Sequence, residues 1–185
     1  LHNNHHTYPT SAKLSVKPYE FDIGWLYIRI LETIGLATVK KTPPKLHYAE
    51  VQAVANEQTL EALITNRYEV MAGFARQLQT ALKQEIAALP KLPADAVLSA
   101  AKRWMHRDEV QVPVQFHALL KQARDALPNV DTMVRMREEL RQLWLNTNAS
   151  RAQLALDLQQ WCLRAEQSGV VALRDFSMQL RAARV

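Results

Sequence analysis

The chain has 185 residues, of which 48% are hydrophobic, 22% are charged and only four are glycine, a composition that excludes a disordered chain and favours a globular, helix-rich protein. The net charge of +5 permits attraction to nucleic acid or anionic lipid, but bases and acids alternate along most of the chain, as on a solvated helical surface. The single cysteine, Cys162, excludes an internal disulfide and suits a reducing compartment.

Three histidines lie within the first six residues. His2, His5 and His6 have the spacing His-x-x-His-His, which places them at i, i+3 and i+4 on one face of a helical turn. Neutral imidazole is the commonest ligand for iron, copper, nickel and zinc, so the cluster indicates part of a metal site. An affinity-tag remnant is the alternative, but a tag would not continue into T-Y-P-T-S-A-K at residues 7–13.

The residues after the cluster resemble a known family. The sequence H-N-N-H-H-T-Y-P-T-S-A at 2–12, with E-F-D-I-G-W at 20–25 and G-L-A at 35–37, resembles the third histidine box of membrane fatty-acid desaturases, in particular the bacterial stearoyl-CoA (delta-9) type. The resemblance covers about the first 45 residues. It implies that His2, His5 and His6 are ligands of two non-haem irons. It also implies an enzyme that uses O2 and two electrons to introduce a cis double bond into a long acyl chain.

The resemblance implies partners and a location as well. The substrate would be an acyl-CoA or acyl-lipid, a ferredoxin- or reductase-type donor would supply electrons, and the histidine box and following residues would lie on the cytoplasmic side of the bacterial inner membrane. The family's other boxes, His-x4-His and a further His-x-x-His-His, are absent, since His47, His106 and His117 are isolated. The family's long apolar stretches are absent too. We therefore expect a C-terminal fragment of a membrane desaturase that is inactive alone.

The first predicted helix covers residues 21–36, after a histidine-bearing turn and an irregular segment in residues 1–18. It is strongly apolar, with a narrow polar stripe formed by Asp22, Arg29 and Thr33. At ~1.5 Å per residue it reaches about 24 Å, which is short of the ~30 Å hydrocarbon core. We expect an amphipathic helix that lies on a membrane surface or packs on upstream helices; a core helix of a soluble domain is the alternative.

The sequence predicts a boundary soon after this helix. Gly35 is expected to end the helix, because glycine adopts the left-handed conformation at helix ends without strain. The segment K-K-T-P-P-K at 40–45 is basic and marked by prolines, as linkers are. We therefore expect residues 1–45 to be the end of a desaturase catalytic domain, and residues 46–185 to be a separate α-helical extension.

The extension is predicted to be a bundle of about five helices, which makes the fold class all-α. The expected helices cover residues 53–89, 95–106 and 113–127, a segment capped by Asn129 or Asp131, a segment from Ser150 to Ser168-Gly169, and residues 171–183. No strand is expected, because the sequence contains neither a sustained period-two run nor an Asn-Gly or Asp-Gly turn.

Few residue patterns typical of catalytic sites follow residue 45. Cys162 is expected to be a packed thiol rather than a nucleophile. Trp104, Trp144 and Trp161 are expected to be core anchors, with base stacking as the alternative. The string K-R-W-M-H-R at 102–107 interleaves cations with an aromatic residue, but two acids follow it immediately.

A second resemblance supports an alternative function. The sequences M-R-E-E-L-R-Q-L-W at 136–144, W-C-L-R-A-E-Q-S-G at 161–169 and L-R-D-F at 173–176 resemble a helical segment of insertion-sequence transposases, over about residues 102–184. This implies a non-catalytic basic module that binds nucleic acid or protein, because no catalytic carboxylate can be carried over. A purely structural tail is a third interpretation. Under the desaturase interpretation we expect no nucleic acid partner.

Overall fold

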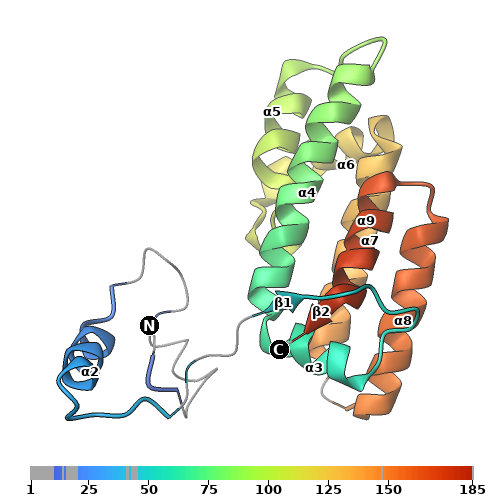
Figure 1. The fold of residues 1–185 in the computed structure, drawn as a ribbon. Coiled ribbons are helices and arrows are strands. Elements are labelled where there is room, and N and C mark those ends of the chain that lie inside the picture. Colours follow the sequence, from blue (N-terminus) through green and yellow to red (C-terminus); the bar gives the residue numbers. More distant parts are fainter. Residues whose placement is uncertain are drawn as a thin grey trace. The chain divides into compact units, whose positions relative to one another are not determined.

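A computed structural model describes residues 11–13, 15, 21–40, 42, 46–146 and 148–184. The chain divides into two compact units, residues up to Lys45 and residues Leu46–Arg184. The all-α prediction is confirmed, since the described residues form eight α-helices, two short 3-10 turns and one pair of two-residue strands (Figure 1).

Helix α2 (Ile23–Thr33) is the helix described in the first unit. The Asp22 side chain caps it by accepting a hydrogen bond from the backbone N–H of Trp25 at 2.8 Å. Asp22 is therefore a buried cap that precedes the helix, whereas the predicted polar stripe placed it on the helix with Arg29 and Thr33. Gly35, with a φ of 76°, follows the C-terminal end of the helix as predicted.

The described residues of the second unit form seven α-helices, where a bundle of about five, drawn from six helical segments, was expected. They are α3 (Glu57–Thr65), α4 (Arg67–Ala88), α5 (Asp95–Trp104), α6 (His117–Ala126), α7 (Pro128–Leu145), α8 (Arg151–Gln167) and α9 (Val171–Ala182). The 3-10 turns Glu109–Gln111 and Val114–Phe116 lie between α5 and α6. Helix α4 packs on α7 and α9, α8 packs on α3, α7 and α9, and α5 packs on α6 (Figure 1).

The prediction of one helix over residues 53–89 is wrong, because Asn66 separates α3 from α4. Its side-chain Nδ2 donates to the Ala62 carbonyl at 2.9 Å, and its backbone, at φ −109° and ψ 23°, leaves the helical conformation. Asparagine side chains compete in this way with the backbone donors of a helix. The start also differs: Asn56 caps α3 by accepting from the Thr59 N–H at 2.9 Å.

Helix α7 begins at Pro128, so the predicted caps Asn129 and Asp131 lie inside the helix. Proline suits the first helical position because its missing N–H would have no partner there. The capping acceptor comes instead from α4: the Glu85 carboxylate accepts from the N–H groups of Asn129 at 3.0 Å and Val130 at 2.8 Å. A cap supplied by another helix leaves no local sequence signal.

A short antiparallel strand pair closes the second unit. Strand β1 (His47–Tyr48) pairs with β2 (Ala183–Arg184), with His47 opposite Arg184. The expectation of no strand is therefore wrong, although two residues are too few to show an alternating pattern. The pairing joins the beginning of the unit to its end (Figure 1).

An aromatic cluster lies at the centre of the core. The ring of Phe74 on α4 lies 4.8 Å from that of Phe176 on α9 and 6.4 Å from that of Trp161 on α8, centroid to centroid. The Trp161 indole N–H donates to the Met136 carbonyl of α7 at 2.8 Å. The prediction that Trp161 is a core anchor is confirmed, and the cluster connects four helices.

Candidate functional site

The predicted iron ligands His2, His5 and His6 lie outside the described residues. In the part of the chain that the structure describes, no three His, Cys, Asp or Glu residues gather in a way that could hold a metal ion. The assignment of these histidines as ligands therefore stays a prediction from the sequence.

The segment that follows the histidines is tied to the start of α2. The second carboxylate oxygen of Asp22 accepts from the Ser15 backbone N–H at 2.9 Å, while the first caps the helix. Both residues are buried. A single aspartate thus holds an upstream residue against the helix, and it lies within the E-F-D-I-G-W motif.

Helix α2 turns its apolar side chains outward. None of its residues is buried, and the exposed apolar side chains on the helix and beside it are Phe21, Ile23, Leu26, Tyr27, Ile30, Leu31, Ile34 and Leu36. Arg29 pairs with Glu32 one turn along the helix and lies over the Trp25 ring. No described helix combines the length and apolarity needed to cross a bilayer. Within the described residues, the apolar face of α2 therefore stays largely exposed.

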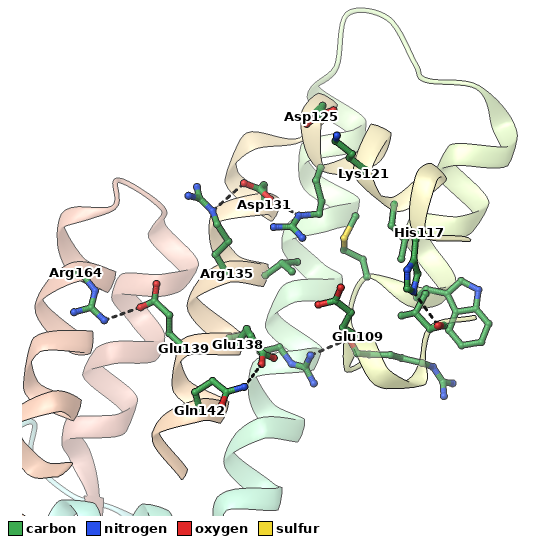
Figure 2. Close-up of a pocket in the computed structure, with 18 residues that line it drawn as sticks. Glu109, His117, Lys121, Asp125, Asp131, Arg135, Glu138, Glu139, Gln142 and Arg164 are labelled. Carbon is green, nitrogen blue, oxygen red and sulfur yellow. Dashed lines mark hydrogen bonds and ion pairs between the residues drawn. The ribbon is translucent and has the colours of Figure 1, made fainter. Parts of the chain in front are cut away.

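The second unit contains a cleft of about 1060 Å³ beside α7. Helices α5 and α6 and their connection form one side of it, and Arg164 of α8 lies at the other (Figure 2). Its apolar lining comes from Trp104, Met105, Val112, Leu120 and Val134. Around these lie charged side chains of both signs, which Figure 2 shows along the exposed face of α7.

The charges that line the cleft largely neutralise one another. Asp131 accepts from Arg124 at 2.5 Å and from Arg135 at 3.1 Å. Glu139 pairs with Arg164 at 2.7 Å, as Figure 2 shows. Hydrogen bonds from the Arg141 guanidinium lower the pKa of the Glu138 carboxyl. The arrangement is suited to holding a neutral or mixed-charge surface, and it offers no activated nucleophile.

Among the described residues, the three isolated histidines and Cys162 do not form a common site. His47 is exposed on β1, and His117 places its Nε2 3.2 Å from the Val112 carbonyl oxygen. Burial, followed by the charges of Arg107 and Arg137, lowers the pKa of His106. Cys162 is 1% exposed, and burial raises the pKa of its thiol. The prediction of a packed thiol is confirmed.

The cleft was not predicted from the sequence. Its charged residues lie three and four positions apart on α6 and α7, a spacing typical of solvated helix faces. Only the packing of α5 and α6 beside α7 shows that these faces enclose a cavity.

Several curated desaturases match a short segment of the chain. The chain is 49% identical over 45 residues to an sn-2 palmitoyl-lipid 9-desaturase of Nostoc sp. (strain 36), which covers 24% of this chain and 16% of that protein. It is 48% identical over 42 residues to Delta-9 acyl-lipid desaturase 1 of Arabidopsis thaliana, covering 23% and 14%. It is 41% identical over 46 residues to an acyl-CoA C20 Delta5-desaturase of Anemone leveillei, covering 25% and 15%.

These matches span between 14% and 16% of the length of the three relatives. No family model matches the chain, and neither does any solved structure. The chain is therefore similar to desaturases only over a segment about as long as its first unit.

Proposed function

We propose that this chain is part of a fatty-acid desaturase, to which it contributes His2, His5 and His6 as iron ligands. The observation that carries the proposal is the similarity to relatives that are all named as desaturases, although their named substrates differ. The matched segments of these three relatives are 42 to 46 residues long, which is close to the length of the N-terminal segment with the histidine motif.

The donor set suits iron in chemical type. Neutral imidazoles bind iron well, and three within five positions can present their nitrogens from one turn of chain. They are too few for two irons, so the remaining ligands must come from residues beyond this sequence. Bound iron would supply the O2 chemistry, in which an acyl CH2–CH2, O2, two electrons and two protons give a cis CH=CH and two waters.

We assign α2 to the interface between the enzyme and the membrane. Its outward apolar side chains and its exposed Tyr27 support this assignment, because aromatic and aliphatic residues favour the boundary between headgroups and acyl chains. The Asp22 bonds to Ser15 and Trp25 would then connect the histidine-bearing segment to a helix lying at that boundary.

The proposed substrate is a long acyl chain carried on a lipid or on CoA. The relatives include enzymes named for acyl-lipid and for acyl-CoA substrates, so the similarity supports the acyl chain and leaves both carriers. A ferredoxin- or reductase-type protein would supply the two electrons. We place the histidine box and the helical extension on the cytoplasmic side of a bacterial inner membrane.

The test is the fatty-acid profile of cells that express this chain together with its natural upstream sequence. We expect a monounsaturated product that falls to the level of cells without the enzyme in a His5→Ala variant. His47→Ala is the matched control, since His47 is exposed on β1 and isolated from the other histidines, and it should leave the product unchanged. An upstream reading frame without His-x4-His and His-x-x-His-His, or full product from His5→Ala, would contradict the proposal.

A further inference from the structure

The connection between α5 and α6, residues 105–116, exposes two valines. Val110 and Val114 are 88% and 82% exposed, the two highest values among the large hydrophobic residues in the described part of the chain. Val112 between them is 8% exposed and lines the cleft. Alternate valines thus point outward, inward and outward.

This connection is fixed in place by polar contacts. The Arg137 guanidinium of α7 donates to the Arg107 carbonyl at 3.1 Å and to the Asp108 carboxylate at 2.6 Å. Further along, His117 Nε2 lies 3.2 Å from the Val112 carbonyl. The outward valines therefore belong to an ordered backbone segment. A partner that binds there causes little further loss of conformational entropy.

Exposed cations lie at the same end of α5 and α6. Lys102, Arg103 and Arg107 are exposed, and contact between the rings of Trp104 and Phe116, 5.6 Å apart, joins this end of α5 to the segment with Val114. Of the two acids that follow, Asp108 pairs with Arg137, while Glu109 is exposed and lines the cleft (Figure 2). The three cations outnumber this exposed acid, so the local charge stays positive and open to an anionic partner.

The aromatic residue of this surface is already covered. The guanidinium carbons of Arg103 and Arg107 lie 5.2 Å and 5.5 Å from the centroid of the Trp104 ring, and Phe116 lies against it as well. Binding of single-stranded nucleic acid depends on aromatic faces that are free to stack on bases. The outward valines would gain nothing from a phosphate backbone, whereas an anionic bilayer satisfies both the cations and the valines.

We propose that Lys102, Arg103, Arg107, Val110 and Val114 form a basic–valine surface that docks on an anionic phospholipid membrane. The cations bind headgroup phosphates, and the valines enter the boundary with the acyl chains. The inference rests on the proposed function for its membrane context, and it supplies a second membrane contact for that enzyme. Its observations come from the second unit, and its test needs no iron site.

A local fluorescent probe on the full 185-residue chain tests the docking. Buried Cys162 resists labelling, so an environment-sensitive fluorophore on Val110→Cys reports on this surface specifically. With phosphatidylcholine–phosphatidylglycerol vesicles we expect a blue shift and brighter emission, both reversed at about 1 M salt, where the Debye length is ~3 Å. The same fluorophore on Leu156→Cys, an exposed position on α8, is the matched control and should not respond.

Several results would overturn the proposal. These are an unchanged probe at position 110, an equal response at position 156, or a response to a DNA duplex that exceeds the response to vesicles. Binding through α2 alone would leave the probe at 110 silent, so the probe separates the two membrane contacts. The fatty-acid profile of His5→Ala depends on neither probe, so the failure of one proposal is distinguishable from the failure of the other.

Charge substitutions provide a second measurement. In the triple variant Lys102→Gln, Arg103→Gln, Arg107→Gln, each lost cation should weaken binding roughly fivefold, or about a hundredfold in total, read as the lipid concentration at half-maximal probe response. The Arg137 contact to residue 107 survives, because it uses the backbone carbonyl. The control triple Lys83→Gln, Lys91→Gln, Arg151→Gln removes three exposed cations elsewhere and should change binding much less. Equal loss in both triples would contradict a specific surface.

Discussion

Helices α2 and α4 place their apolar side chains in opposite environments. In α2 no residue is buried, and Ile30 is 50% exposed. In α4, Phe74 and Leu78 are fully buried against the neighbouring helices. Both helices have apolar residues at helical spacing, so the difference lies in what packs on them. Apolar spacing predicts a helix, and the partner of its apolar face must be found by other means.

The same contrast separates the two units. The buried hydrophobic cluster of the second unit runs from Ala55 to Ala183 and includes residues from all seven of its helices. The second unit therefore has a core of its own. The described part of the first unit instead presents an exposed apolar helix surface, of the kind that marks interaction sites in other proteins.

The largest expected effect is on the free energy of unfolding, which should fall far more when a core side chain is truncated than when an exposed one is. Phe74→Ala should lower the free energy of unfolding by about 3–5 kcal/mol, because it removes a fully buried ring and leaves a cavity against Trp161 and Phe176. Ile30→Ala should change it by less than about 0.5 kcal/mol. Denaturant unfolding of the two variants in aqueous buffer measures both. A large loss in Ile30→Ala would show that α2 packs against a core.

A smaller effect is expected at the cap that α4 supplies to α7. Glu85→Gln replaces a carboxylate that accepts two backbone N–H bonds at the start of α7, and it should cost about 1 kcal/mol through the lost charge and acceptor. Thermal unfolding provides the measurement. Glu61→Gln on α3 removes an exposed carboxylate and is the control. Equal stability of the two variants would contradict a capping role for Glu85.

A structural feature could be predicted from the sequence when the residues that determine it lie close together in the chain. The all-α class, a helix that starts at Ser150, and the glycine-marked helix ends at Gly35 and Gly169 follow from neighbouring residues, and the structure confirms them. The Ser150 side chain accepts from the Gln153 N–H at 3.1 Å, as a cap should.

The features that were missed depend on residues far apart in the chain. Glu85 caps a helix that begins 43 positions later, β1 pairs with a strand at the other end of the unit, and the cleft exists because α5 and α6 pack beside α7. Neither the spacing of residues along the chain nor its composition indicates those contacts. The histidine motif is the reverse case: its signal is wholly local, and its ligand role stays a prediction from the sequence.

The smallest expected effect is the pH dependence that His106 gives to the second unit. Burial, with Arg107 and Arg137 adding to it, holds the pKa of His106 below its ordinary value of 6.5. As pH falls, the unfolded chain therefore takes up this proton before the folded chain does. Stability is fully present above pH 6.5 and declines between 6.5 and the lower pKa of the folded state. Thermal unfolding across this range should show the decline.

Substitution separates His106 from the other titrating groups. His106→Gln should flatten the decline, because glutamine fills similar space and takes up no proton. His47→Gln should leave the decline intact, because His47 is exposed on β1. If the two variants keep the same slope, folding does not lower the pKa of His106, and neither its burial nor the nearby Arg107 and Arg137 contributes this pH dependence.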